Sequence, residues 1–348
     1  MQTKKLGFED SLQKDVVDQC RCVGCAACTV VCPFTCLEYA DGTPRLVKAC
    51  ENCGICPRVC PTYDWSWPQA EEFVFGMRRE ERQGFGIFRR LIVARAADRR
   101  VLEKCQDGGA VTAVLAYALQ NGIVEGAAIS GRSATRPLYP EPKLATTVEE
   151  VVENAGTRYA YSPNLLAFQE GVKQGMKSLA FVGTPCQIHA VRKMQMFPLK
   201  KYANPLKLAV GLMCTESFVY EGLLEEHIRG KLGIDLSDVV KMNIKGKILV
   251  RLASGDETSI PLAEAKQYTR NSCRTCSDFS AELADISAGG LGLNGWTFII
   301  LRTELGEQIF NDVVDAHMLK TREIGEEPLA YSLLTKLSRK KMQNTPRR

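Results

Sequence analysis

The chain has 348 residues, of which 45% are hydrophobic and 24% are charged, enough for two packed units and at least one sizeable core. Its formal net charge of +5 is a mild excess that suits an anionic small molecule, and no basic block is long enough to favour nucleic acid. The amino-terminal segment has no apolar centre and no apolar run reaches the ~18 residues of a membrane span, so we expect a cytoplasmic protein that reaches a membrane only through partners.

The first feature in chain order is a dense run of cysteines. Ten of the fifteen cysteines lie between Cys20 and Cys60, in short regular spacings that indicate metal binding in a reducing compartment rather than disulfides. The pattern C-x2-C-x2-C-x3-C-P occurs twice, beginning at Cys22 and at Cys50. Three thiolates at such spacing wrap one face of a [4Fe–4S] cluster, while the fourth, before the proline, binds the other cluster.

The two motifs therefore exchange their last ligands, and residues 1–61 are predicted to be a bacterial-type 2[4Fe–4S] ferredoxin domain. Gly24 and Gly54 would let backbone amides approach the sulfurs. A zinc ribbon also uses C-x2-C pairs, but it does not explain two triplets each closed by Cys-Pro. Cys20 and Cys36 fall outside the pattern and receive no role. We assign one cluster to Cys22, Cys25, Cys28 and Cys60, and the second to Cys50, Cys53, Cys56 and Cys32.

The rest of the chain has the pattern of an α/β unit. Residues 62–86 mix tryptophans and charges without a sustained period and are predicted to be an ordered linker. In residues 87–348, apolar stretches alternate with amphipathic ones, which predicts an α/β core with a mixed, largely parallel sheet. Residues 241–262, turning at Gly255-Asp256, add antiparallel strands, and the last thirty residues are predicted to be a basic helix. The expected strands include 91–96, 123–130, 178–183 and 206–214, and the longest expected helices are 110–120 and 221–233.

Two cysteines of the core follow predicted strands, where sites form in open α/β sheets. Cys186 and Cys214 would therefore meet at one edge of the sheet. With Cys273 and Cys276 of a polar C-x2-C loop, they make four candidate ligands for a third [4Fe–4S] cluster. The alternatives stay open, because a buried cysteine is also a common small hydrophobe and a lone C-x2-C pair binds zinc or nothing.

The segment from Gln106 to Thr112 opens the long helix at 110–120. Its glycines give flexible backbone and free amides that could cradle a pyrophosphate. An ordinary helix start capped by Asp107 explains the segment equally well.

Other short motifs and the histidines give no functional assignment. The glycines at 290–295 match G-x-G-x-x-G by letter, but the residues after them predict a strand, whereas a dinucleotide site needs a helix there. His189, His227 and His317 are expected to be packing or surface residues, and no residue is assigned to catalysis.

Four motifs of the core stand out: GTPCQ at 183–187, MCTESF at 213–218, CRTC with the sequence through 292, and GWT with LRTELG at 295–306. They are similar to the family of flavin-containing β subunits that handle coenzyme F420 in hydrogenases and formate dehydrogenases, and the similarity spans residues 106–306. With the ferredoxin domain ahead of it, the chain most resembles the electron-input subunit of the F(420)H(2) dehydrogenase complex of methanogenic or related archaea.

The resemblance implies the cofactors of the core. Cys186, Cys214, Cys273 and Cys276 would hold the third cluster, beside a bound FAD. Cys105 stands where relatives often carry a small polar residue, and its role stays open. The residues implied near the flavin are Gln106, Gly108, Gly109, Thr112, Arg158 and Tyr159.

The implied activity is oxidation of reduced coenzyme F420 by hydride transfer to FAD, which splits the electron pair for the clusters. The implied acceptor is a membrane-bound methanophenazine or quinone oxidoreductase complex, or soluble ferredoxin, with the chain peripheral on the cytoplasmic face. Alternatives are the coenzyme F420-linked input subunit of a sulfite- or heterodisulfide-reducing assembly, and a pure electron-transfer adaptor. Pigment reductases share the flavin and cluster core, but the duplicated ferredoxin motif argues against them.

Overall fold

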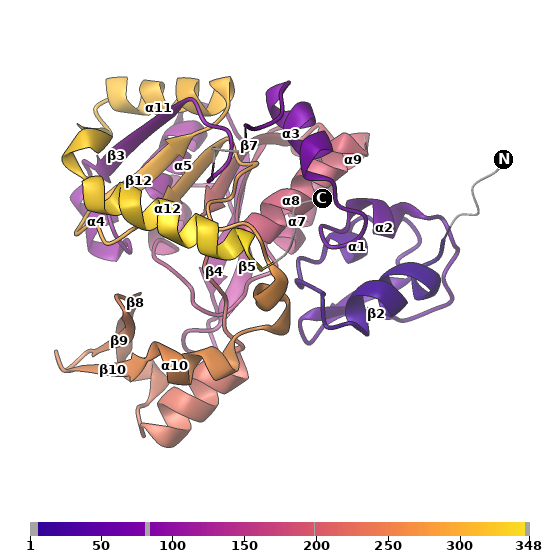
Figure 1. Cartoon of the computed structure of the whole chain (residues 1–348), viewed down its shortest axis with the longest axis horizontal. Helices are drawn as coiled ribbons and strands as arrows, with labels where there is room; N and C mark the ends of the chain where they lie inside the picture. Colours follow the sequence, from indigo (N-terminus) through magenta and orange to yellow (C-terminus); the bar gives the residue numbers. More distant parts are fainter. Residues whose placement is uncertain (1–5, 81–83, 198, 345–348) are drawn as a thin grey trace.

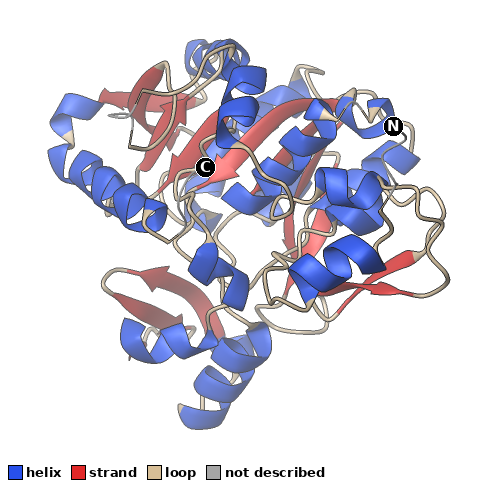
Figure 2. Cartoon of the chain, turned by 45° about the vertical axis from the view of Figure 1, so that its right-hand side comes forward, coloured by secondary structure: helices blue, strands red, loops and turns tan. Residues whose placement is uncertain are grey.

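The computed structural model describes residues 6–80, 84–197 and 199–344, which form an α/β core, an amino-terminal lobe and a small antiparallel sheet (Figure 1). The amino-terminal lobe, drawn in indigo, lies at one side of the core. Figure 2 shows helices around the large central sheet. Across the described ranges, no helix combines the length and apolar content needed to cross a membrane.

The amino-terminal lobe is built around its two cysteine motifs. Each triplet runs into a short helix that begins after a left-handed residue, Ala26 (φ 65°) or Gly54 (φ 72°). So small a lobe buries little apolar surface by itself. Val23, Val30 and Val59 complete its packing by joining a hydrophobic cluster of the α/β core. The elements are η1 (Glu9–Val17), α1 (Ala27–Val30), the hairpin strands β1 (Leu37–Ala40) and β2 (Thr43–Leu46), and α2 (Ile55–Val59).

The segment after this lobe is ordered and packed into the core. Its helix α3 (Trp67–Phe75) has proline in its first turn and ends at Gly76, whose φ of 68° suits glycine. Arg79 forms ion pairs with Glu71 and, at 2.5 Å, with Glu282, which follows the C-x2-C loop of the core. The Arg79 side chain is 14% exposed, and those of Glu71 and Glu282 are 3% and 0% exposed. Buried charges need such partners, so this segment is fixed to the core by more than its covalent ends.

The central sheet of the core has eight strands in the order β13-β3-β12-β11-β7-β6-β4-β5. The central strands β11, β7, β6 and β4 run parallel to one another, and the outer pairs are antiparallel. The strands are β3 (Arg90–Ala96), β4 (Gly126–Arg132), β5 (Pro140–Ala145), β6 (Leu179–Gly183), β7 (Leu206–Leu212), β11 (Ile286–Gly289), β12 (Thr297–Leu301) and β13 (Leu319–Glu323).

Helices cover both faces of this sheet, so its central strands are buried on both sides and are nearly continuous apolar runs. One face packs against α5 and α11. The other packs against α7 and α8 together with the amino-terminal lobe and α3, while α12 covers its far end. The helices are α4 (Arg99–Lys104), α5 (Ala110–Gln120), α6 (Val148–Glu153), α7 (Leu165–Lys173), α8 (Pro185–Met196), α9 (Lys200–Ala203), α11 (Glu304–Asp315), η6 (Ile324–Glu326) and α12 (Pro328–Met342).

A second, three-stranded antiparallel sheet projects from the core with its own small hydrophobic cluster. It is the expected antiparallel addition, and the chain turns at Gly255 (φ 94°). Its elements and neighbours are η2 (Glu221–Lys231), η3 (Leu236–Asp238), β8 (Val239–Ile244), β9 (Lys247–Leu252), β10 (Glu257–Pro261), α10 (Leu262–Ala265), η4 (Lys266–Tyr268) and η5 (Asn271–Thr275).

The prediction of a mixed α/β core is confirmed, and its parallel part is the central block of the sheet. The two long helices and all four named strands lie where expected within a few residues. The glycines at 290–295 precede strand β12, so rejecting them as a dinucleotide fingerprint was correct. The antiparallel edge formed by β12, β3 and β13 was not predicted.

Candidate functional site

A cavity of about 240 Å³ opens where the parallel strands end. We call it the main cavity. It lies at the carboxyl edge of the sheet, where sites form in α/β folds. Its walls come from the first turn of α5, from the loop after α6, and from the ends of four strands. They include Gly109, Ala110, Val111, Thr112, Ser130, Gly156, Thr157, Val182, Leu212, Met213, Gly289 and Gly290.

Helix α5 begins at the wall of the main cavity without a side-chain cap. Its N-cap is Gly109, with φ of 71°. The alternative in which Asp107 caps this helix is therefore wrong. The first-turn amides have no partner within the helix, and such amides favour an anion such as a phosphate.

The six residues implied near the flavin divide into three sets. Gln106, Gly109 and Thr112 line the main cavity. Arg158 and Tyr159 line an adjoining side cavity of about 450 Å³, which Gln106 also borders. Gly108 lies behind both, where its amide donates to Thr297 Oγ1 at 3.1 Å and a Cβ would lie 2.6 Å from the Ala94 carbonyl oxygen.

Arg158 supports the cavity walls rather than offering free charge to a ligand. Its guanidinium donates to the backbone carbonyls of Asn154, Ala155, Gly156 and Gly131, at 2.8 to 3.3 Å. Burial lowers its pKa to about 10, and the neighbouring Arg132 adds to the shift. The side chain thus fixes the loop that presents Gly156 to the main cavity.

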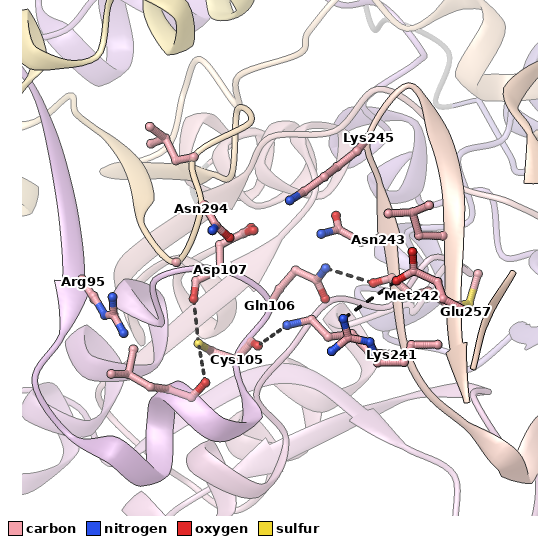
Figure 3. Close-up of a pocket in the computed structure, with 15 residues that line it drawn as sticks. Arg95, Cys105, Gln106, Asp107, Lys241, Met242, Asn243, Lys245, Glu257 and Asn294 are labelled. Atoms are coloured by element: carbon pink, nitrogen blue, oxygen red, sulfur yellow. Dashed lines mark hydrogen bonds and ion pairs between the residues drawn. The ribbon is translucent and has the colours of Figure 1, made fainter. Parts of the chain in front are cut away.

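A third cavity, of about 360 Å³, is rich in basic side chains (Figure 3). We call it the basic cavity. Arg95, Lys241, Lys245 and Arg251 line it, and Lys241 donates to the carbonyl of Cys105 at 3.3 Å. It shares Cys105, Gln106 and Asp107 with the main cavity. Burial raises the pKa of Asp107, while Lys241 and Lys245 oppose that rise, so the basic side chains act electrostatically at the junction of the two cavities.

Sequence reasoning found no basic mouth, because its residues are spread from Arg95 to Arg251. One signal was available. Lys241, Asn243 and Lys245 alternate with apolar residues, and period-two spacing puts them on one face of a strand. Figure 3 shows all three on the side of the small sheet that borders the cavity.

The four candidate cysteines of the core lie together beside the main cavity. We call them the core thiol group: Cys186, Cys214, Cys273 and Cys276. Cys186 opens α8 and Cys214 follows β7. Burial, opposed by Lys341, is the main reason that the pKa of Cys276 is raised to about 12 and that of Cys214 is also raised; Cys186 contributes to the rise at both, and Cys273 and Cys276 contribute at Cys214. These mutual shifts require the thiols to be close in space.

Polar contacts hold the sulfurs of the core thiol group. Thr184 Oγ1 lies 3.2 Å from Cys186 Sγ, and the Ser217 amide donates to Cys273 Sγ at 3.5 Å. From α12, Lys341 donates to the Cys273 carbonyl at 3.3 Å. Burial lowers the pKa of Lys341, but the four nearby thiols raise it, and the net pKa lies above its usual value.

The cysteines of the amino-terminal lobe gather into two further groups, with Cys60 near the first triplet and Cys32 near the second. Burial raises the pKa of Cys28, and Cys60 and Cys22 raise it further. Burial raises the pKa of Cys56 to about 12, and Cys50, Cys53 and Cys32 add to it. We call these the inner thiol group (Cys22, Cys25, Cys28 and Cys60) and the outer thiol group (Cys50, Cys53, Cys56 and Cys32).

Backbone amides point at these sulfurs. Gly24 donates to Cys22 Sγ at 3.4 Å, Phe8 to Cys50 Sγ at 3.4 Å, and Cys36 to Cys32 Sγ at 3.3 Å. Such hydrogen bonds tune iron–sulfur clusters. Within the described ranges, no three His, Cys, Asp or Glu side chains gather closely enough for a single metal ion.

The remaining candidates have structural surroundings. His189 is buried, stacks on Trp65 with ring centroids 4.5 Å apart, and lies 2.9 Å from the Asp278 carboxylate. His227 is buried against Tyr268. Cys20 is exposed, whereas the Cys105 thiol is buried and lies 2.9 Å from the Asp107 carbonyl.

Family models match most of the core. Two models described as "Coenzyme F420 hydrogenase/dehydrogenase, beta subunit" cover the two parts of that protein. The model of the amino-terminal part matches residues 91–169, and the model of the carboxy-terminal part matches residues 176–327. The matches contain the main cavity and the core thiol group.

Individual relatives belong to the same family as these models. Coenzyme F420 hydrogenase subunit beta of Methanothermobacter thermautotrophicus is 40% identical over 74% of this chain and 92% of its own length. One subunit of the F(420)H(2) dehydrogenase of Methanosarcina mazei is 30% identical over 90% of this chain and 87% of its own. A chain of the F420-reducing [NiFe] hydrogenase complex from Methanosarcina barkeri is similar in structure, with a TM-score of 0.73 and 33% identity over 76% of this chain and 92% of that chain. This chain therefore belongs to the family of coenzyme F420 hydrogenase/dehydrogenase β subunits.

Proposed function

We propose that this chain oxidises reduced coenzyme F420 and delivers the electrons one at a time, through three [4Fe–4S] clusters, to a membrane-bound quinone or methanophenazine oxidoreductase complex. The observation that carries the proposal is the arrangement of the three thiol groups. The core thiol group adjoins the main cavity, because Met213 lines the cavity and Cys214 is the next residue. Cys25 of the inner thiol group belongs to a hydrophobic cluster of the core, whereas Cys56 of the outer thiol group packs within the lobe, and we therefore place the inner group nearer the core.

Contacts from the core support this order. Lys193 of α8 donates to the carbonyl of Cys60 at 3.0 Å, and Tyr202 and Gln169 donate to that of Val30 at 2.6 and 3.0 Å. All three contacts reach the inner side of the lobe. Each thiol group supplies four cysteines, the ligand set of a [4Fe–4S] cluster.

We assign the FAD of this proposal to the main cavity. The first-turn amides of α5 would hold its pyrophosphate, and Leu212 and Met213 offer apolar contact to its ring. Gly289 and Gly290 line the opposite wall, and they let Met213 and Asp107 pack closely there, since a Cβ at either glycine would lie 2.5 Å from atoms of these side chains. When bound, the flavin supplies the conversion between a hydride and single electrons.

The basic cavity would receive the anionic end of the coenzyme. Coenzyme F420 carries a phosphate and a glutamate tail, and positive side chains at a cleft raise the local concentration of such an anion. Because the basic cavity meets the main cavity at Gln106 and Asp107, one molecule could place its tail in the first and its deazaflavin ring at the second.

The partner complex is chosen by the amino-terminal lobe. Similarity to the F(420)H(2) dehydrogenase protein extends over 90% of this chain and therefore into the lobe. The Coenzyme F420-dependent sulfite reductase of Methanocaldococcus jannaschii also matches into the lobe, over 86% of this chain, but the match covers 47% of that protein against 87% of the dehydrogenase protein. This difference favours the membrane complex. The second candidate is the input subunit of another coenzyme F420-linked reductase, which would use the same cavities and thiol groups.

Anaerobic reduction tests the proposal. We expect about one FAD and about twelve iron atoms per chain, since each [4Fe–4S] site holds four irons. Reduced coenzyme F420 should bleach the flavin absorbance, and NADH should not. Bleaching by NADH at a comparable rate would overturn the proposed donor. A chain without flavin that still accepts electrons would instead be an adaptor.

A further inference from the structure

Arg270 bridges two thiol groups that are far apart in the sequence. It precedes η5, and its carbonyl accepts the amide of Cys273 at 2.9 Å. Its Nη1 donates to the carbonyl of Val23 at 3.0 Å. One side chain thus links the loop that carries Cys273 in the core to the loop that carries Cys22 and Cys25 in the amino-terminal lobe.

The surroundings of the guanidinium hold it in this position. It lies over the ring of Tyr161, with Cζ 4.1 Å from the ring centroid, and the Tyr161 hydroxyl lies 3.9 Å from Cys186 Sγ. On the other side, a Cβ at Gly24 would lie 2.5 Å from Arg270 Nη2. The glycine therefore leaves the space that the guanidinium fills, directly before Cys25.

The guanidinium lies beside ligand-bearing segments on both sides. Its Nη1 contacts the carbonyl of Val23, the residue after Cys22. It also lies over the ring of Tyr161, whose hydroxyl is next to Cys186 Sγ. Lys193 and Lys341 lie beside the inner and the core thiol group respectively, whereas Arg270 lies between the two groups.

We propose that Arg270 is a positioning residue for electron transfer between the core and inner clusters. Its side chain fixes the two loops against each other, and its charge stabilises an added electron on either side. One electron leaves the core group, which is oxidised, and reaches the inner group, which is reduced, with no proton transferred. The negative charge therefore stays next to the same guanidinium throughout. This inference rests on the proposed function, because it requires both clusters to be bound.

Redox titration of the full chain tests the proposal without coenzyme F420. Wild type, Arg270→Gln and Arg270→Lys are poised with dithionite and mediators, and the clusters are followed by electron paramagnetic resonance after iron and flavin are counted. In Arg270→Gln, the potentials of the core and inner clusters should both become more negative, and their magnetic interaction should weaken. The outer cluster should keep its potential, because Arg270 does not reach it.

Two further variants make the test decisive. Arg274→Gln removes a positive charge from the same turn, but the Arg274 side chain is exposed; the substitution should leave the inner cluster unchanged. Arg270→Lys keeps the positive charge but loses the planar guanidinium with its fixed N–H donors. It should therefore shift the potentials of both clusters less than Arg270→Gln does, while still weakening the magnetic interaction between them.

Unshifted potentials in an iron-replete Arg270→Gln chain would overturn the proposal. If that variant fails to load iron, the Arg270→Lys chain decides: wild-type potentials together with a wild-type magnetic interaction would show that the guanidinium is not needed. Failure of the proposed function itself is visible separately, as missing iron in the unsubstituted chain or as a flavin that coenzyme F420 does not bleach.

Discussion

Several residues that mark the family act by supporting the core thiol group. The Asp285 carboxylate accepts hydrogen bonds from Arg192 at 2.9 Å and from Thr303 at 2.8 Å. Arg302, only 1% exposed, donates to the carbonyls of Phe85 and Ser280. These contacts fix the chain just after Cys276. The motifs were recognisable from sequence, but their structural role depends on partners distant in the sequence.

At the level of single ligands, we predict that Cys273→Ala lowers iron from about twelve to about eight atoms per chain. FAD should remain, because Cys273 does not line the main cavity. Reduced coenzyme F420 should still bleach the flavin, whose reoxidation by the partner should be slow. Iron analysis and stopped-flow absorbance check this. Cys20→Ala, at an exposed cysteine, is the control, and a Cys273→Ala chain with full iron would contradict the ligand assignment.

The basic cavity gives a second prediction at this scale. Replacing Lys241 and Lys245 together by Gln should raise KM for reduced coenzyme F420 roughly tenfold, since two partly solvated contacts of about 0.7 kcal/mol each add to about 1.4 kcal/mol. The salt dependence of KM should flatten, and kcat should hold. Steady-state kinetics at two ionic strengths measure this. Lys247→Gln, on the same hairpin but outside the cavity lining, should behave as wild type.

At the scale of elements, local sequence patterns predicted individual helices and strands correctly, but they did not predict which strands pair in the sheet. The helix Ala110–Gln120 and the strand Leu179–Gly183 follow from apolar runs bounded by glycine or proline. The antiparallel edge of β12, β3 and β13 joins residues about two hundred positions apart, which no local period records. The inner and outer thiol groups were proposed from Cys-Pro spacing, which is local like the helix pattern, whereas the core thiol group joins distant cysteines and was proposed from strand ends and the family resemblance. Arg270 and the basic cavity were not, because their partners are distant.

The attachment of the segment around α3 to the core can be tested through Arg79, which follows that helix and pairs with two buried carboxylates. Arg79→Met leaves the Glu71 and Glu282 carboxylates without this partner in the interior, and we expect unfolding to become easier by about 3 kcal/mol. Thermal denaturation should show a fall in melting temperature of roughly 4 °C, because an unfolding entropy of ~2.1 cal/mol/K per residue over 348 residues corresponds to about 0.7 kcal/mol per degree. Arg78→Met is the matched control, because the Arg78–Glu72 pair is exposed, at 64% and 58%. Equal losses in the two variants would contradict a role for burial.

At the scale of the whole molecule, the lobe and the core share one hydrophobic cluster, so removing the lobe should have two separable effects. We predict that a chain beginning at Thr62, which keeps α3, still binds FAD and that reduced coenzyme F420 still reduces this flavin. Its melting temperature should fall, because Val23, Val30 and Val59 are removed from that hydrophobic cluster. Small acceptors should still be reduced, whereas delivery to the membrane partner should stop. Equal delivery by the shortened chain would show that the lobe lies off the electron path.

Helix α8 also bears on the rate of electron transfer. Cys186 stands in its first turn, and Lys193, seven residues later, holds the carbonyl of Cys60. At ~1.5 Å per residue these two points lie about 10 Å apart along a rigid axis. Under the proposed electron path, this helix holds the inner thiol group at a fixed place beside the core thiol group. An inserted residue between Cys186 and Lys193 would turn Lys193 by about 100° around the helix axis, away from the Cys60 carbonyl. Electron tunnelling slows steeply with distance, so we expect slower delivery to the partner although every cysteine of the three thiol groups is kept.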